Sequence, residues 1–84
     1  MPKFIVKRRE FIEHRQTMYG RRASWGKWRT LGSFDRATDA ADRRLQETTG
    51  LHQTVVFFGG RIVIDWRGGH DLATAKLIRE ERGA

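Results

Sequence analysis

Several features that often fix the chemistry of a small protein are missing from this sequence. It contains no cysteine, so disulfides cannot staple the fold and a zinc site with thiolate ligands is excluded. The three histidines, His14, His52 and His70, lie far apart and lack the spacing of metal ligands. The longest apolar runs are a few residues each, far below the roughly 18 needed to cross a bilayer. The sequence therefore predicts no metal site, no cofactor and no membrane partner.

Catalytic motifs are missing as well. His70-Asp71 resembles part of a catalytic dyad, but no nucleophile accompanies it, and a helix cap explains Asp71 better. Asp65 is a single acid near a strand end, and Gly68-Gly69 is too short for a phosphate-binding loop. We therefore predict that the protein is not an enzyme and has no catalytic residues.

The length and the N-terminus define the broad class. The 84 residues make one small basic domain, residues 1–84, because no repeat or linker divides the chain. The first residues contain no apolar stretch long enough for a signal peptide. We expect a soluble protein of the cytoplasm, which would be the host cytoplasm for a phage-encoded chain.

Positive charge is abundant and unevenly distributed. The formal net charge is +7. Residues 1–34 carry nine Lys or Arg against two acids, residues 35–50 carry three against four, and residues 51–84 carry five against four. The whole excess therefore lies in the N-terminal part, which is typical of a surface that binds a polyanion. The alternative is a solvated basic face without a partner.

The stretch from Gly20 to Phe34 combines four cationic side chains with Trp25 and Trp28. Aromatic rings can stack on bases while neighbouring guanidinium groups bind phosphates. This combination favours nucleic-acid binding. Alternatively, the tryptophans pack over the first helix; we expect Trp25 to be the exposed one and Trp28 to face the helix. Lys7 and its basic neighbours either extend this surface or pair with Glu10 and Glu13. The predicted binding residues are Arg8, Arg9, Arg21, Arg22, Trp25, Lys27 and Arg29.

The first half of the chain predicts strands followed by one helix. The β-forming residues 3–8 predict a strand that continues through Phe11 and Ile12 as one long or bulged strand. Residues 19–22 predict a turn that exposes Arg21 and Arg22, and residues 27–31 predict a second strand ended by Gly32-Ser33. Asp35 is the expected N-cap of a helix over residues 36–49 that ends at Gly50. The expected buried stripe of this helix is Ala37, Ala41, Leu45 and Thr48, with Ala40 beside it.

The second half predicts a β-hairpin and a final helix. Residues 54–66 contain two β-rich runs around Gly59-Gly60, which is typical of a two-residue hairpin turn. Asp71 is the expected cap of a helix from Leu72 to about Arg82, ended by Gly83. Both faces of the hairpin are apolar, so the second face needs a cover from this helix or from a second chain, as a homodimer. The expected pairs are Phe57 with Ile62, Val56 with Val63, and Val55 with Ile64.

These elements predict an α+β fold. A small antiparallel sheet packs on one main helix, with the hairpin at about residues 54–66 and a short C-terminal helix.

Residues 20–45 resemble sheet-type DNA-binding domains. Trp25-Gly-Lys-Trp28, followed by Leu31-Gly-Ser-Phe-Asp-Arg-Ala-Thr-Asp-Ala-Ala41, resembles the DNA-binding domain of plant ethylene-response factors. It is also similar to the arm-type DNA-binding domains of phage integrases. In those families a three-stranded antiparallel sheet lies in the major groove. The resemblance implies that Arg21, Arg22, Trp25, Lys27, Trp28 and Arg29 contact the nucleic acid here.

Two functions remain open from the sequence. The first is a non-enzymatic nucleic-acid-binding protein of a phage or mobile element, with DNA favoured over RNA. The second is a protein-binding inhibitor of a host defence complex, whose basic face meets an acidic protein surface. The second function follows from overall character, since a compact α+β domain without motifs resembles small phage-borne proteins such as anti-CRISPR inhibitors.

Overall fold

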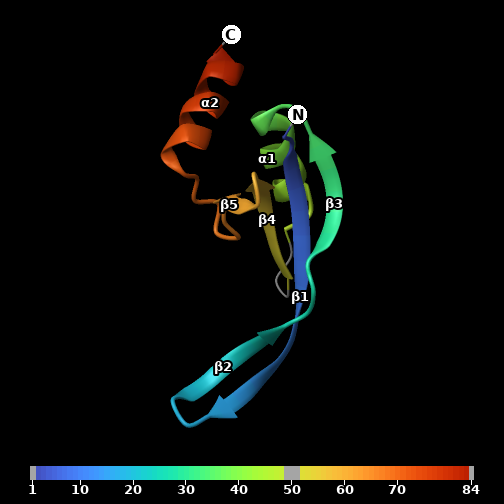
Figure 1. The fold of residues 1–84 in the computed structure, drawn as a ribbon, viewed down its shortest axis with the longest axis vertical. Helices are drawn as coiled ribbons and strands as arrows, with labels where there is room; N and C mark the ends of the chain where they lie inside the picture. The colour runs from blue at the N-terminus through green and yellow to red at the C-terminus, as the bar shows by residue number, and fades with distance from the viewer. Residues whose placement is uncertain (1, 49–51, 84) are drawn as a thin grey trace.

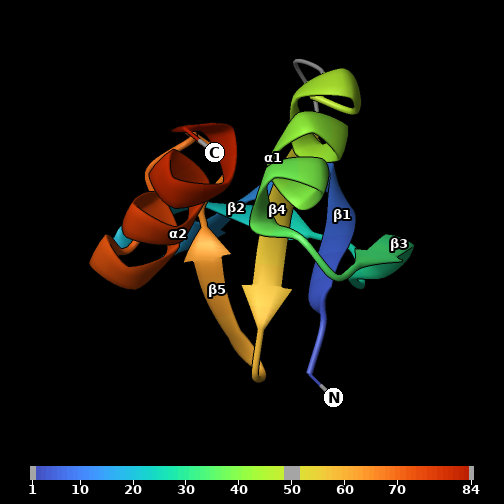
Figure 2. The same ribbon diagram turned by 90° about the horizontal axis from the view of Figure 1, so that it is seen from above.

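The computed structural model describes residues 2–48 and 52–83, and it shows a curled antiparallel sheet with two helices over one face (Figures 1 and 2). The predicted α+β class is confirmed. Neither helix in the described residues is long and apolar enough to span a membrane. The elements are β1 (Phe4–Thr17), β2 (Gly20–Trp25), β3 (Arg29–Phe34), α1 (Ala37–Gln46), β4 (His52–Phe58), β5 (Arg61–Ile64) and α2 (Leu72–Gly83).

Strand β1 is the longest element, and it joins two parts of the molecule. Its first half, residues 4–10, lies between β3 and β4, and β5 pairs with the other edge of β4. Its second half, residues 11–17, pairs only with β2. This two-stranded segment, residues 11–25, projects from the sheet and is called the arm below (Figure 1). The predicted long, bulged strand is confirmed, with a register shift between Phe11 and Glu13.

The turn of the arm falls slightly earlier than predicted, at Met18-Tyr19. Gly20 has a φ of 115° and begins β2, so Arg21 and Arg22 lie in a strand and not in the turn. The Thr17 hydroxyl donates a hydrogen bond to the Gly20 carbonyl (2.7 Å) and accepts one from the Tyr19 amide (3.2 Å). This local bonding closes the hairpin with ordinary backbone angles at Met18 and Tyr19.

The second predicted strand also has different bounds. It was expected over residues 27–31, but β3 runs through Gly32 and Ser33, which pair with Val6 and Ile5 of β1. Glycine and serine locally favour a break in the strand. Here the hydrogen bonds between β3 and β1 keep both residues in the strand.

The core lies between the sheet and the helices. It contains Phe4 and Val6 of β1, three alanines of α1 and Ile78 of α2. The small alanines let α1 approach the sheet closely. The buried stripe predicted for α1 is wrong at Leu45, which is 61% exposed, and at Thr48, which is exposed beyond the end of the helix, while Arg44 is buried. Arg44 reaches the connection between β5 and α2, where its Nη1 donates to the Trp66 carbonyl (3.3 Å).

The N-cap predicted for α1 is wrong. Asp35 lies one residue too early, and Arg36 occupies the cap position without a side-chain hydrogen bond. Glu81 of α2 caps the helix instead, accepting hydrogen bonds from the Ala37 amide (3.2 Å), the Thr38 amide (3.1 Å) and the Thr38 hydroxyl (2.9 Å). Burial raises the pKa of Glu81, but these hydrogen bonds outweigh it and hold the pKa below its usual 4.5. The end of α2 therefore fixes the start of α1.

Helix α1 is also shorter than predicted, since it ends at Gln46. The expected stop at Gly50 lies outside the described residues.

The predicted hairpin is confirmed, with one difference in register. Phe57 pairs with Ile62 as expected, but a bulge places Ile64 opposite Val56, so the other two predicted pairs are wrong. The bulge lets both Val63 and Ile64 be buried.

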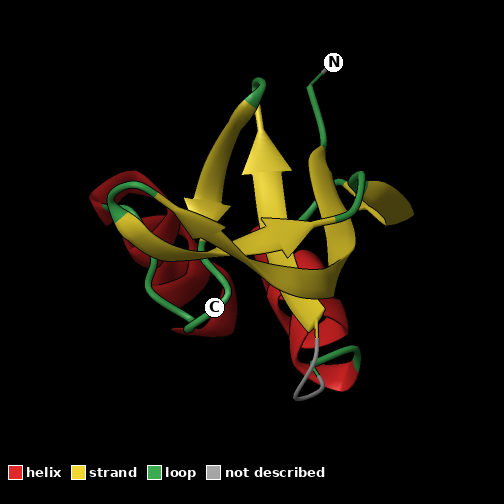
Figure 3. Ribbon diagram, turned by 90° about the horizontal axis from the view of Figure 1, so that it is seen from below, coloured by secondary structure: helices red, strands yellow, loops and turns green. Residues whose placement is uncertain are grey.

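Helix α2 packs on the hairpin face that also meets α1, so the prediction that it covers the second apolar face is wrong. The Asp71 carboxylate accepts the Thr74 amide (2.8 Å) as the predicted cap, and hydrogen bonds from Thr74 lower the pKa of Asp71. The helix lies on the same side of the sheet as α1 (Figure 2), where Ile78 joins the core with Val56 and Val63. One face of the hairpin is thus covered within the chain, and the opposite face of the sheet carries no helix (Figure 3).

Candidate nucleic-acid interface

The sheet face that carries no helix is called the open face below (Figure 3). Side chains alternate along β1, so the burial of Phe4 and Val6 in the core places the odd-numbered residues 5–11 on the other side. No Asp or Glu in the described strands falls on this face by the same alternation. Its main residues are Ile5, Lys7, Arg9, Phe11, Trp25, Trp28, Gln53, Val55 and Phe57.

Arg9 occupies the centre of the open face, between two tryptophans. Its Cζ lies 5.1 Å from the ring centre of Trp25 and 4.6 Å from that of Trp28. Its Nε donates a 2.8 Å hydrogen bond to Oε1 of Gln53, which is itself buried. The planar guanidinium thus contacts the two indole rings and also donates a hydrogen bond from its edge. Lysine cannot reproduce this geometry.

Further contacts extend this cluster in both directions. On one side, Trp28 meets Phe57 edge to face with ring centres 5.5 Å apart, and the Lys7 ammonium lies 4.8 Å from the Phe57 ring centre. On the other side, Trp25 meets Phe11 at 5.7 Å, and Phe11 lies 5.0 Å from the His14 ring. We call this series the ladder; its members are Lys7, Phe57, Trp28, Arg9, Trp25, Phe11 and His14.

The expectation that Trp28 faces the helix is wrong. Residues 26–28 form an irregular connection between β2 and β3, and the Gly26 amide donates to the Glu10 carbonyl (2.8 Å). This connection breaks the alternation of a regular strand, so Trp25 and Trp28 contact the same guanidinium. Both tryptophans are partly buried.

The positive charge around the open face is poorly neutralised. In the described residues, six cations of the N-terminal part make no ion pair: Lys7, Arg9, Arg21, Arg22, Lys27 and Arg29. Arg21 and Arg22 are exposed on the arm, Lys27 is exposed in the connection, and Arg29 is exposed at the start of β3. By alternation from Trp25, Arg21 shares the face of the ladder and Arg22 points to the opposite face of the arm.

Two cross-strand pairs place like charges directly opposite each other. Arg15 lies opposite Arg22 in the arm, and Arg8 lies opposite Arg29 in the sheet. Such pairs destabilise an antiparallel sheet. Acids offset one member of each pair, since Arg15 lies 3.3 Å from Glu13 and Arg8 lies near Glu10 and Glu47.

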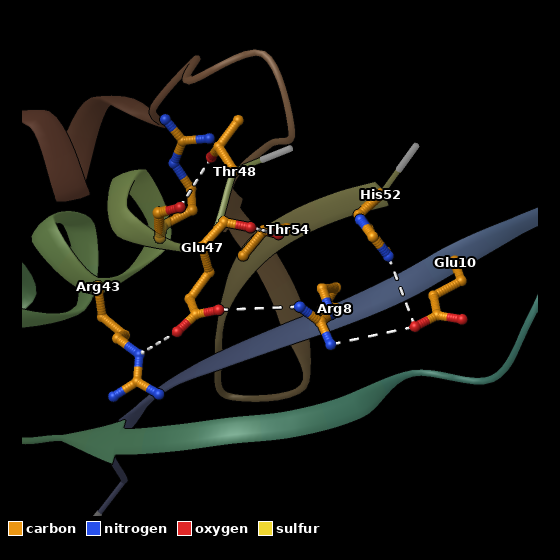
Figure 4. A network of polar contacts seen from close by, with 8 residues as sticks. Arg8, Glu10, Arg43, Glu47, Thr48, His52 and Thr54 are labelled. Carbon is orange, nitrogen blue, oxygen red and sulfur yellow. Dashed lines mark hydrogen bonds and ion pairs between the residues drawn. The ribbon is translucent and has the colours of Figure 1, made fainter. Parts of the chain in front are cut away.

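Two of the predicted binding residues, Arg8 and its cross-strand partner Arg29, lie on the helix side of the sheet. Arg8 is also neutralised by acids. It lies on the helix side of β1, where its Nη1 is 3.8 Å from Glu47 and its Nη2 is 4.0 Å from Glu10 (Figure 4). Glu47 also accepts a hydrogen bond from Nε of Arg43 (3.1 Å), and Glu10 lies 3.5 Å from Nε2 of His52. These acids neutralise Arg8 and tie it to the end of α1.

The structure thus assembles part of the predicted site and adds to it. It brings Arg9 and Trp25 together and leaves the exposed arginines and Lys27 around them. Of the two alternatives predicted for Lys7, the structure favours extension of the surface, because its ammonium lies over the Phe57 ring. The prediction missed Phe57, which reaches the ladder only through the pairing of β4 with β1.

The described residues offer no metal centre beside this surface. Within residues 2–48 and 52–83, no group of three His, Asp or Glu side chains lies close enough together to hold a metal ion.

The comparisons with known proteins add no relative. Neither the protein-family models nor the curated proteins nor the solved structures contain a match to this chain. The resemblance of residues 20–45 to sheet-type DNA-binding domains therefore stays a prediction.

Proposed function

We propose that this protein binds nucleic acid, without catalysis, through the open face of its sheet and its arm. The observation that carries the proposal is the ladder, a continuous series of cations and aromatic rings on a face where the described strands present no acid. Phosphate contacts supply most of the affinity of such interfaces, and aromatic planes add stacking.

The ladder is suited to this role because its central residue is already held in place. Gln53 and the two tryptophans fix the Arg9 guanidinium, so little further side-chain entropy is lost when it meets a ligand. Base stacking on an aromatic side chain contributes about 1–3 kcal/mol per base. Trp25 and Trp28 have partly exposed rings on which bases can stack.

The shape of the arm favours duplex DNA over duplex RNA. Two-stranded ribbons enter the grooves of B-DNA. The A-form RNA helix has a major groove that side chains cannot read and a minor groove that is wide and shallow. A projecting basic ribbon therefore has a matching surface on DNA.

Fluorescence anisotropy with labelled DNA and RNA duplexes over a series of salt concentrations tests the proposal. About five phosphate contacts predict that log affinity falls with log salt with a slope near −4 to −5 on B-DNA. Trp25→Ala should weaken binding, while Trp66→Ala is the matched control, because Trp66 is exposed outside the ladder and stacks only with Arg67.

Absent or salt-independent binding at low salt would contradict the proposal. That result would favour the second function, in which the same basic face binds an acidic surface of a host protein complex.

A further inference from the structure

The tip of the arm carries two large apolar side chains in solvent. Met18 is 88% exposed and Tyr19 is 83% exposed. Of the large apolar residues that the structure describes, only Leu72 is more exposed. The tip lies at the end of the arm that is far from both helices (Figure 1).

The turn itself does not require these residues. Gly20 provides the positive φ, and Thr17 provides the side-chain hydrogen bonds that close the turn. Polar residues and glycine usually fill such exposed turn positions. The apolar character of Met18 and Tyr19 therefore has no explanation in the folding of the hairpin.

The flanks of the tip are basic. The two strands behind it carry Arg15, Arg21 and Arg22, and Glu13 is the one acid of the arm. Arg15 already pairs with Glu13 (3.3 Å), so Arg21 and Arg22 are available to phosphates. An apolar tip between cationic strands matches a ligand that has apolar planes inside and negative charge along its edges, which is the cross-section of a DNA duplex.

We propose that Met18 and Tyr19 insert between adjacent base pairs of duplex DNA from the minor groove and kink the duplex. The inference rests on the proposed function, because Arg21 and Arg22 hold the phosphates on either side of the tip. Apolar wedges of this kind partly unstack one base step and bend the duplex by about 20–90°. Two strands lie about 4.8 Å apart before their side chains are counted, so the arm fits a minor groove about 6 Å wide only when the groove opens. Insertion of the tip therefore opens the groove, and the opened groove admits the two strands of the arm.

The test measures binding and bending separately on one duplex. Anisotropy gives the affinity, energy transfer between dyes at the two ends gives the bend, and 2-aminopurine inside the duplex reports unstacking. The wild-type protein should shorten the end-to-end distance and raise the 2-aminopurine fluorescence. The double variant Met18→Ser/Tyr19→Ser should lose both signals and should keep the salt slope, because it removes no charge.

Three controls separate the explanations. Leu72→Ser removes an equally exposed apolar side chain in α2, far from the arm, and should bend DNA like the wild type. Arg21→Ala/Arg22→Ala should reduce the salt slope by about 0.9 for each lost contact. Circular dichroism and thermal melting confirm that each variant folds.

A chemical measurement gives an independent answer. Hydrogen peroxide oxidises exposed methionine, so oxidation of Met18 followed by mass spectrometry should slow when the duplex is bound.

The outcomes distinguish the two proposals. Salt-dependent binding without a bend, or an unchanged bend with the double variant, would refute the inserted tip and leave nucleic-acid binding intact. An absence of salt-dependent binding to any duplex would refute both.

Discussion

Replacing Arg9 by alanine should destabilise the protein strongly, because this side chain joins three elements. The change removes two cation–π contacts, worth about 0.5–1 kcal/mol each, and a hydrogen bond from a charged donor, worth about 1.5–3 kcal/mol. Contributions within one network overlap, so we expect a loss of about 2–3 kcal/mol in the free energy of unfolding. For a domain of this size that lowers Tm by roughly 10–20 °C.

Thermal and urea unfolding followed by circular dichroism measure this loss, and two other variants serve as controls. Arg21→Ala removes the same charge from an exposed strand position and should change stability by less than about 0.5 kcal/mol. Arg9→Lys keeps the charge and loses the planar stacking, so its stability should lie between that of Arg9→Ala and the wild type. If Arg9→Ala unfolds at the same temperature as Arg21→Ala, the ladder does not hold the open face together and the reasoning fails.

Two further predictions concern the helices. Glu81→Ala should cost about 0.5–2 kcal/mol by removing the cap of α1, with Glu80→Ala as an exposed neighbouring control. Because the folded pKa of Glu81 is lowered, its contribution is complete above pH 4.5 and is lost as the pH falls through the folded pKa, so the stabilities of the wild type and Glu81→Ala should converge in acid. Deleting residues 71–84 should expose the core face around Val63 and cause aggregation or unfolding in light scattering and melting; a monomer of equal stability would contradict the role of α2.

The elements that the sequence predicted well are those with local signals. The hairpin has a glycine pair between two β-rich runs, and Asp71 stands directly before the helix that it caps. The long first strand was also readable, because β-formers continue past its charged centre.

The wrong predictions concern local structure that depends on residues far away in the sequence. Arg21 and Arg22 have no strong β preference, and they form a strand because β1 offers them a partner. The cap of α1 comes from Glu81, which lies 43 residues beyond Thr38, so no local pattern announces it.

The candidate site was predicted in composition but not in geometry. The stretch between Gly20 and Phe34 includes Trp25 and Trp28, both of which the structure places in the ladder. Their arrangement depends on the irregular connection at residues 26–28 and on the placement of Phe57 by β4, which a single sequence does not reveal.

The two halves of β1 differ in the free energy of local opening. Residues 5–8 are paired on both edges, and Val6 among them lies in the core, so we expect their amides to open only when the whole domain unfolds. Residues 11–17 are bonded on one edge only and contribute no residue to that core, so they open by a local event of lower free energy. The register shift between Phe11 and Glu13 marks the boundary. We therefore expect the arm to open locally while the rest of the domain stays folded.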